Sequence, residues 1–452
     1  MSHASGRVGR ISTKGLIDLT LTTFRGDSTA GALARGGTWS FVFRVATLVV
    51  AAVAQIVLVK VLGEVDYGRY TYVLGWANVA VVFTVFNFEY ASVKYVAKYH
   101  SARALGLLRG FERTATSFTT LLSVGTAVVL ALLVWLLAPG RASDLRVPAI
   151  IACGMIPVLT ALSVNSERLR GRRLIAQSHI HEVLRPLLLL GTVIIAAYLM
   201  GVDVDVSVVL ALNLAGALVV GAINGGLAFR SSLETRAAAP EYRRREWFGT
   251  AVGLMPMAIA QLALGSKTDV VIVGSFVDTT AAGVYSISAL LMAPTSFIVA
   301  STATIAGPMI ADYYGNQRFD ELRKLVVLIA RINIGLTVPI VLAIYVVAPF
   351  VLAWLGPAFT AGYPVVLLLG IAAISSTLGG HAALMSTMTG HHNRASLIIG
   401  SCAVLNLLLA IVLGYLFGVT GVAAATTIAQ VTRSVALTIA AKRFTGISLM
   451  PF

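Results

Sequence analysis

Three arginines lie inside long apolar stretches of the sequence, where charged side chains are rare. Arg44, Arg331 and Arg433 each interrupt such a stretch, and Arg433 lies deepest in its own. A cation in the middle of a bilayer costs at least about 2.5–3.5 kcal/mol, so it usually faces a polar cavity or a partner. A guanidinium presents a planar fork of donors that matches phosphate oxygens. The three arginines are therefore candidates for binding a diphosphate, although Arg44 and Arg331 could instead reach the membrane surface.

Lys267 and Asp269 form a second candidate site near the predicted outer end of another apolar stretch. A carboxylate at this position could bind a coupling cation or a proton. Alternatively, Asp269 could pair with Lys267 at the membrane interface. The sequence leaves both interpretations open.

The other residues that could do chemistry do not form a recognisable catalytic or metal site. The sequence has no Gly-rich phosphate loop ending in Lys-Ser/Thr, no HExxH motif and no GxSxG motif. His179, His181 and Glu182 lie in a basic segment, while Cys153 and Cys402 each lie in an apolar stretch. We therefore expect no enzymatic activity, no cofactor and no metal site.

The stretches that position these residues are long and apolar enough to cross a membrane. Of 452 residues, 58% are apolar and 12% are charged, whereas soluble domains carry about a quarter charged residues. A helix of about 20 apolar residues crosses a hydrocarbon core about 30 Å thick. The sequence predicts an all-α integral membrane protein with about twelve transmembrane helices, at residues 39–62, 70–88, 114–137, 147–164, 183–200, 206–229, 247–265, 281–305, 325–347, 361–388, 395–417 and 419–441.

Positive charges are distributed unevenly between the predicted loops. With a cytoplasmic N-terminus, 26 of the 34 Lys and Arg residues lie on the cytoplasmic side and five lie on the outer side. Because Lys and Arg concentrate in cytoplasmic loops, both termini are predicted to be cytoplasmic. This distribution accounts for most of the net charge of +15 without nucleic acid as a partner. Part of the charge should also favour the anionic inner leaflet.

A polar segment near the middle of the chain, RSSLETRAAAPEYRRRE, divides the predicted helices into two groups of six. Transporters with two such lobes place the substrate between the lobes and move one against the other. We therefore predict two lobes around a central cavity. The predicted parts are a cytoplasmic N-terminal segment (1–35), an N-terminal lobe (36–229), a cytoplasmic linker (230–246), a C-terminal lobe (247–444) and a cytoplasmic tail (445–452).

Three local patterns resemble a known family of membrane proteins. They are LGEVDYGRY at residues 62–70, the run from Asp269 through Gly274 to Tyr285-Ser286, and the segment from Gly390 through Asn406 to GVTGVAA at 418–424. In this order they resemble the polysaccharide-biosynthesis flippases of the multidrug/oligosaccharidyl-lipid/polysaccharide exporter superfamily. The resemblance implies a cationic central cavity, alternating access and, in many members, ion antiport. Arg44 resembles an arginine in the first helix of many members, whereas Arg331 and Arg433 have no firm match in the family.

The resemblance and the membrane arginines together predict a multi-pass flippase in the cell membrane. Its expected substrate is a polyprenyl-diphosphate-linked oligosaccharide used for surface polysaccharide assembly, with twelve spans rather than the fourteen common among lipid II flippases. Expected partners are membrane lipids, Na⁺ or H⁺, and other glycan-assembly proteins. One alternative is an ion-coupled multidrug exporter, which would need an acidic cavity. A membrane glycan polymerase is a weaker alternative because the longest predicted outer loop has only about fifteen residues.

Overall fold

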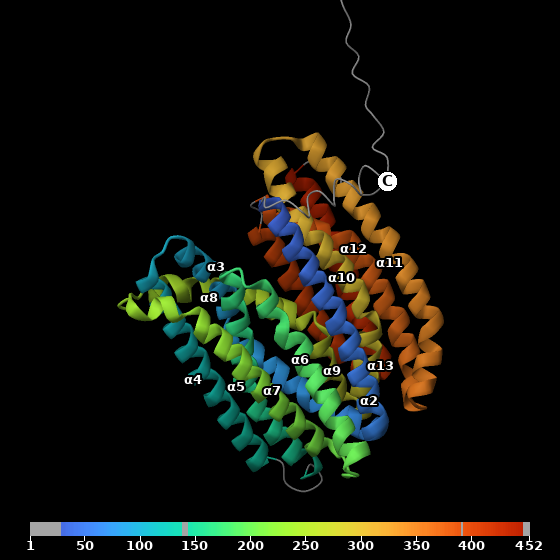
Figure 1. Ribbon diagram of the computed structural model, residues 1–452. Coiled ribbons are helices and arrows are strands. Elements are labelled where there is room, and N and C mark those ends of the chain that lie inside the picture. The colour runs from blue at the N-terminus through green and yellow to red at the C-terminus, as the bar shows by residue number, and fades with distance from the viewer. Residues whose placement is uncertain (1–28, 138–142, 390–391, 446–452) are drawn as a thin grey trace, which may run out of the picture.

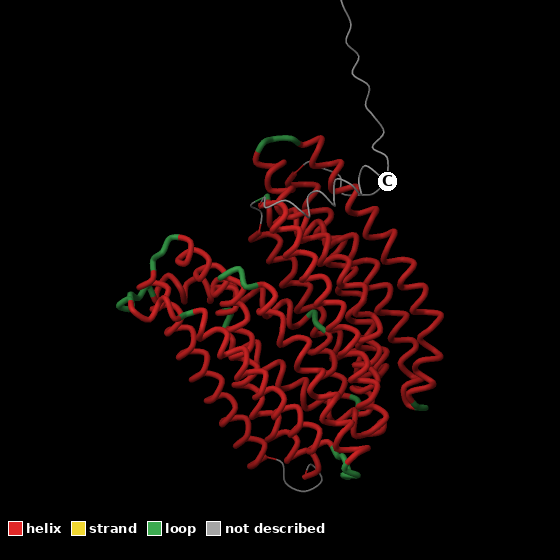
Figure 2. The backbone as a smooth tube through the Cα atoms, viewed as in Figure 1, coloured by secondary structure: helices red, strands yellow, loops and turns green. Residues whose placement is uncertain are grey.

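The computed structural model describes residues 29–137, 143–389 and 392–445, and this part of the chain contains helices and no strand (Figure 2). The first half comprises α2 (Thr29–Val85), α3 (Phe88–Ser101), α4 (Leu105–Leu137), α5 (Ser143–Gly171), α6 (Ile175–Ile194), which continues as a π-helical turn (Ile195–Leu199), and α7 (Val206–Ser231). The second half comprises the 3₁₀ turn η3 (Leu233–Ala237), α8 (Arg244–Ala263), α9 (Ser266–Phe276), α10 (Thr279–Gly315), α11 (Phe319–Leu355), the 3₁₀ turn η4 (Ala358–Gly362), α12 (Tyr363–Met388) and α13 (His392–Thr445).

Within the described part of the chain, nine helices are long and apolar enough to cross a membrane. The pair α8 and α9 adds a tenth span if it is counted as one helix broken by a 57° bend. Exposed Leu, Val, Ile and Phe side chains cover much of the surface of these helices, as expected for contact with lipid tails. The prediction of an all-helical, multi-pass integral membrane protein is confirmed.

The long helix α2 reverses direction at Gly63, which has a positive φ of 75°. The Tyr67 hydroxyl donates a hydrogen bond of 2.9 Å to Gln55 Oε1. In a straight helix these residues would lie about 18 Å apart along the axis, so the hydrogen bond requires two antiparallel segments. Glycine adopts this backbone conformation without the strain that a side chain would bring. The turn lies where the sequence predicts the end of the first span.

The last helix, α13, reverses in the same way at Gly418, where φ is 63°. Beyond the turn, a Cβ atom on Gly421 would collide with the carbonyl oxygen of Leu413, so the two antiparallel segments meet at a residue without a side chain. Twelve spans require a reversal at each of these two glycines. The number of crossings and the side on which the termini lie stay predictions.

The helices pack in two groups along the chain. Helices α4 to α7 pack with α2 and α3, while α9 to α13 pack with one another, and α2 also contacts α9 and α10. Figure 1 shows α4 and α5 at one side of the molecule and α11 at the other, with α2 and α6 between them. The contact between α2 and α10 is close because Gly68 lies directly against the backbone of Thr279.

Helix α8 contacts both groups: its first turn packs against α3 and α4, while the rest of the helix packs mainly against α13. Trp247 Nε1 donates to the Tyr99 hydroxyl at 3.0 Å, and the Phe248 ring lies 4.9 Å from that of Phe118. Helix α9 also contacts α13, together with α10 and α2. The chain bends at Leu264 and Gly265, so Lys267 and Asp269 lie in the first turn of α9, just beyond the span predicted for residues 247–265.

Candidate functional site

Asp269 lies in the first turn of α9 and is completely buried. The Tyr285 hydroxyl of α10 donates to its Oδ2 at 2.6 Å, and the Thr426 hydroxyl of α13 donates to the same oxygen at 3.0 Å. Within the described residues, Asp269 makes no ion pair. The alternative of a Lys267–Asp269 pair at the interface therefore does not describe this state of the protein.

Two buried oxygens at this site have no hydrogen-bond partner in the described structure, namely Asp269 Oδ1 and Asn406 Oδ1. The Asn406 amide group donates to the Ala263 carbonyl at 2.8 Å, which fixes the orientation of the side chain. An unsatisfied buried oxygen costs about 1–3 kcal/mol. Oxygens from a carboxylate, an amide and the Thr426 hydroxyl are the ligand types that hard cations take. The arrangement suits a small cation or a proton on the carboxylate.

Lys267, two residues earlier, has a different environment from Asp269. Its side chain is exposed, and Arg185 of α6 and Glu89 of α3 lie within electrostatic range of it. Its carbonyl oxygen lies against Gly75 of α2. Lys267 is therefore located where α9 faces the helices of the N-terminal group.

Arg185 is held in place by a chain of hydrogen bonds across three helices. Its Nε and Nη2 atoms each donate to Asn213 Oδ1 at 3.3 Å, and Asn213 Nδ2 donates to the Tyr70 hydroxyl at 2.9 Å. Within the described residues, neither Arg185 nor Lys267 makes an ion pair. The two side chains form a positively charged cluster between the two helix groups, which we call the Arg185–Lys267 cluster.

From the sequence, Arg185 is one of the 26 cations counted as cytoplasmic, at the mouth of the span predicted for residues 183–200. In the structure α6 begins at Ile175, so Arg185 lies about ten residues, or about 15 Å, inside the helix. The early start is helped by local pairing of several polar residues in the first turns, including the Ser178 hydroxyl, which donates to the Ile175 carbonyl. His179 Nδ1 pairs with Glu182 Oε1 at 3.0 Å. The sequence did contain a signal for this position. Arg185 stands between Leu184 and Pro186 in an apolar run, and Pro186 lies inside α6.

Glu89, at the start of α3, is the carboxylate that balances part of this charge. Burial raises the pKa of the Glu89 carboxyl above its usual value, and the nearby carboxylate of Glu167 raises it further. Lys267 and Arg170 oppose this shift. With two cations and one carboxylate that resists ionisation, the region favours an anionic ligand.

The three arginines predicted from the sequence lie at separate places. Arg44 belongs to α2, but its side chain lies outside the described residues. Arg331 is exposed on α11, beside the exposed Leu328 and Ile332. Arg433 is half-buried on the second segment of α13 and lies within electrostatic range of Cys402. Helix α12 packs against both α11 and α13.

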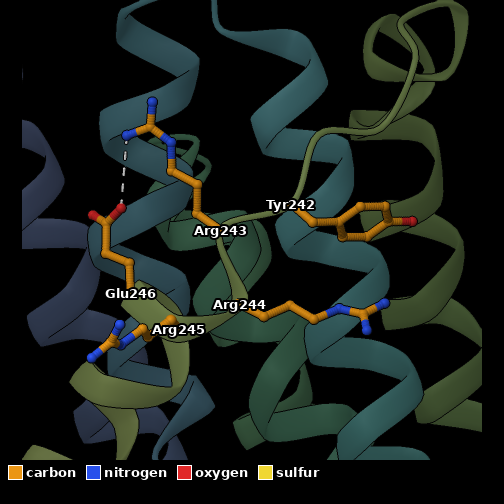
Figure 3. A pocket seen from close by; sticks show the side chains of 5 residues that line it. All are labelled: Tyr242, Arg243, Arg244, Arg245 and Glu246. Atoms are coloured by element: carbon orange, nitrogen blue, oxygen red, sulfur yellow. Dashed lines mark ion pairs between the residues drawn. The ribbon is translucent and has the colours of Figure 1, made fainter.

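The last residues of the predicted linker and the first turn of α8 form a surface pocket of about 510 Å³ lined by Tyr242, Arg243, Arg244, Arg245 and Glu246 (Figure 3). Arg243 Nη1 pairs with Glu246 Oε2 at 3.8 Å, while the Arg244 guanidinium lies 5.0 Å from the centre of the Tyr242 ring. The three arginine side chains point in different directions in Figure 3. Because they do not converge, this basic segment does not form a common binding site.

Comparison with known proteins identifies similar sequences and folds. Residues 33–314 match the model of a family described as polysaccharide biosynthesis protein. A search of curated proteins finds no match. The chain is similar in structure to an inward-facing multidrug resistance MATE family transporter of the MOP superfamily, with a TM-score of 0.69, 13% sequence identity, and coverage of 95% of this chain and 98% of that chain.

Two further solved structures show the same likeness. One is the outward-facing conformation of a multidrug resistance MATE family transporter, with a TM-score of 0.66, 15% identity, and coverage of 94% of this chain and 98% of that chain. The other is a MOP superfamily transporter from Pyrococcus furiosus, for which a reversed polarity of the binding pocket suggested a different function; its TM-score is 0.65, its identity 14%, and its coverage 94% and 98%. At these identities the likeness shows a shared fold.

Proposed function

The chain belongs to the polysaccharide biosynthesis protein family, and from this premise we propose that it is a flippase for a polyprenyl-diphosphate-linked oligosaccharide. It is a multi-pass membrane protein with the fold of MOP superfamily transporters. The observation that carries the proposal is the Arg185–Lys267 cluster, because its two cations come from different helix groups and make no ion pair within the described residues. Such a site favours an anionic head group over a cationic drug.

The hydrogen bonds around Arg185 support a role in binding the diphosphate. The guanidinium offers a planar fork to two phosphate oxygens, whereas Lys267 adds a point charge. Because Asn213 and Tyr70 already hold Arg185, little side-chain entropy is lost when the ligand binds. The polyprenyl tail stays in the lipid, so only the polar head crosses the membrane as residues 36–229 and 247–444 move against each other.

Asp269 is proposed to bind the coupling Na⁺ or H⁺. Its unpartnered Oδ1 and that of Asn406 are the ligands, and Thr426 contributes a hydroxyl. Asp269 and Lys267 lie two residues apart on the same short helix. Binding of the ion at Asp269 therefore changes the position of Lys267 or the electrostatic potential around it, and binding of substrate at Lys267 has the reverse effect. The coupling ion drives the transition between the inward and outward states only if it binds these two states with different affinity.

The three arginines predicted from the sequence keep their proposed role as additional contacts of the head group. They are Arg44, Arg331 and Arg433. Arg433 is the strongest of these candidates because it is half-buried in a membrane helix. Replacement of Arg433 by alanine is expected to abolish surface glycan assembly while the protein remains in the membrane. Normal glycan in that variant would remove Arg433 from the site.

A binding measurement tests the proposed substrate site. Purified protein is titrated with a fluorescent polyprenyl-diphosphate oligosaccharide, and the Kd is compared between the wild type, Arg185→Gln and Lys267→Gln. We expect each variant to bind at least about tenfold more weakly, because each loses a charge-assisted contact to the diphosphate. Arg173→Gln, which removes an exposed arginine just before α6, is the matched control and should bind like the wild type. Unchanged affinity in both test variants would reject the site.

A multidrug exporter is the second candidate function, favoured by the fold shared with MATE transporters and by the carboxylate of Glu89 near the cluster. A cationic drug would have to approach Arg185 and Lys267, and the repulsion of like charges opposes this. If the same titration shows tighter binding of a cationic dye than of the oligosaccharide lipid, and Glu89→Gln abolishes it, the exporter is the better assignment.

A further inference from the structure

A groove outside the Arg185–Lys267 cluster runs between three helices of the N-terminal group. It has a volume of about 1080 Å³ and is bounded by α4, α5, α7 and the turn η3. Figure 1 shows α4, α5 and α7 together at one side of the molecule, and α5 packs against both of the others. A volume at the upper end of the range of about 300–1,000 Å³ for small-molecule sites leaves room for a large ligand. The lining residues that matter here are Arg109, Arg113, Arg168, Arg236, Thr116 and Leu121.

The groove carries uncompensated positive charge. Four arginines and one carboxylate, Glu112, line it. Glu112 Oε1 forms an ion pair of 2.6 Å with Nη2 of Arg172, which lies behind the lining. The only lining carboxylate among the described residues is therefore neutralised by a fifth arginine. An anion in the groove would restore the balance.

Arg168 is the buried member of this set, with 7% of its surface exposed. Its Nη2 atom donates to the Glu112 carbonyl at 2.8 Å and to Thr116 Oγ1 at 2.6 Å, while its Nε has no partner in the described structure. The side chain is thus fixed at the floor of the groove, and its buried Nε–H donor is left without a partner among the described residues. A buried guanidinium without a carboxylate of its own is costly unless an anion approaches it.

The other three lining arginines, Arg109, Arg113 and Arg236, differ in how the protein holds them. Arg109 Nη1 donates to the carbonyls of Arg236 and Ala238, both at 2.6 Å, and so anchors the segment that carries Arg236. The Arg236 guanidinium lies 3.6 Å from the centre of the Phe229 ring. Arg236 is therefore positioned over the groove, whereas Arg113 is exposed on α4.

The lining changes from charged to apolar along α4. Arg109 and Arg113 come first, then the hydroxyls of Thr116, Ser117 and Thr120, then Leu121 and Val124. Helix α4 has 33 residues, about 50 Å, so about 20 Å of it extends beyond a hydrocarbon core about 30 Å thick. If the apolar end at Leu137 marks one boundary, the other lies near Phe118. The arginines then lie at head-group depth, and Leu121, with 76% of its surface exposed, lies among the lipid tails.

We propose that this groove binds an anionic phospholipid from the membrane leaflet that contacts the arginine-rich loops. Its phosphate lies between Arg113, Arg168 and Arg236, its glycerol region lies along Thr116 and Thr120, and an acyl chain follows Leu121 and Val124 into the bilayer. Charge complementarity and the polar-to-apolar order of the lining select a lipid rather than a free anion. Basic pockets between helices on the cytoplasmic side are suited to such head groups. The site is separate from the proposed substrate cluster and does not depend on the flippase proposal.

The test compares lipids by the thermal stability of the purified full-length protein in nonionic detergent. A ligand that binds only the folded state raises the melting temperature in proportion to its occupancy. Phosphatidylglycerol, phosphatidylcholine and sodium pyrophosphate are titrated separately against the wild type, the double variant Arg113→Gln/Arg236→Gln, and the control Arg230→Gln. Arg230 is an exposed arginine at the same end of α7 and does not line the groove.

We expect phosphatidylglycerol to raise the melting temperature of the wild type and of Arg230→Gln. The apparent affinity of the double variant should be at least about tenfold weaker, since charge-assisted contacts to the phosphate are lost. Phosphatidylcholine and pyrophosphate should give no comparable shift. The proposal is overturned if phosphatidylcholine acts equally well, if the double variant responds like Arg230→Gln, or if pyrophosphate alone shifts the melting temperature through these arginines.

Discussion

Two buried carboxylates in the described part of the chain are stabilised by the surrounding helices in different ways. Glu112 of α4 is 9% exposed and forms an ion pair with Arg172 at 2.6 Å. Asp269 of α9 is 0% exposed and receives hydrogen bonds from the hydroxyls of Tyr285 and Thr426, and the Asn406 side chain also lies within hydrogen-bonding range. The first carboxylate has a permanent counter-charge, while the second depends on neutral donors.

This difference separates a structural carboxylate from one that can take part in transport. The charge of Glu112 is balanced in every state in which Arg172 stays beside it. The charge of Asp269 can be balanced by a cation or a proton that enters and leaves, and two buried oxygens at that site are free to receive one. The following substitutions test whether the two carboxylates really differ.

The largest effect is expected from Arg172→Gln. This change leaves Glu112 buried without its ion-pair partner, and breaking a buried pair by removal of one member costs about 3–5 kcal/mol. The free energy of unfolding, measured by denaturant titration in detergent, should fall by that amount.

The double variant Glu112→Gln/Arg172→Gln provides the control for this prediction. It removes both charges, so it should recover part of the lost stability. A single variant as stable as the wild type, or a double variant no better than the single one, would contradict the assignment of Glu112 as a paired structural carboxylate.

Tyr285→Phe should have an intermediate effect. It removes the hydroxyl that donates to Asp269 at 2.6 Å, and a hydrogen bond to a charged group contributes about 1.5–3 kcal/mol. The matched variant Tyr345→Phe removes a hydrogen bond of 2.6 Å to the neutral Leu367 carbonyl, which contributes about 0.5–1.5 kcal/mol. Thermal unfolding of both variants measures the difference. Equal losses would mean that Asp269 carries no charge in the state measured.

A smaller change in stability is expected from Asp269→Asn. The amide keeps an oxygen that accepts from Tyr285 and Thr426 and removes a buried charge that has no ion-pair partner within the described residues. The free energy of unfolding should stay within about 1 kcal/mol of the wild type. Transport should lose its dependence on the cation gradient. A stability loss as large as that of Arg172→Gln, or transport that still responds to the gradient, would place Asp269 with the structural carboxylates.

The smallest effect concerns Glu89, a partly exposed carboxylate outside the membrane spans. Burial and the nearby Glu167 raise its pKa in the folded protein. The folded state therefore binds its proton more tightly than the unfolded chain, and stability falls as the pH rises from the ordinary glutamate pKa through the raised value. Glu89→Gln should remove this decrease, which leaves the variant slightly more stable at neutral pH but not in acid. Melting temperatures measured from pH 4 to 8 would show an unchanged profile if Glu89 is not shifted.

The sequence predicted the fold better than it predicted the sites. Long apolar stretches identified the membrane helices, and the reversals at Gly63 and Gly418 fall in gaps between predicted spans, since hydropathy is a local property. Asp269 was also visible, because a carboxylate in an apolar stretch is conspicuous. Its hydroxyl partners were not, because Tyr285 and Thr426 come from other helices.

Arg185 and the lipid groove show what the sequence could not provide. Arg185 was counted among the cytoplasmic cations because it lies only two residues inside the apolar stretch that begins at Val183, whereas the helix begins eight residues before Val183, at Ile175. Arg168 was assigned to the same loop, yet it lies at the floor of a groove between α4, α5 and α7. Both depend on where the helices begin and on which faces pack together, and these are properties of the tertiary structure.

One reconstitution experiment tests the central claim most directly. Proteoliposomes are prepared with the wild type or with Arg185→Gln/Lys267→Gln, and movement of a fluorescent polyprenyl-diphosphate oligosaccharide between leaflets is followed by quenching from outside. The account predicts that the wild type moves this lipid but not a cationic dye, and that the double variant moves neither while it remains folded. Movement of the dye without the oligosaccharide lipid, or full activity in the double variant, would contradict it.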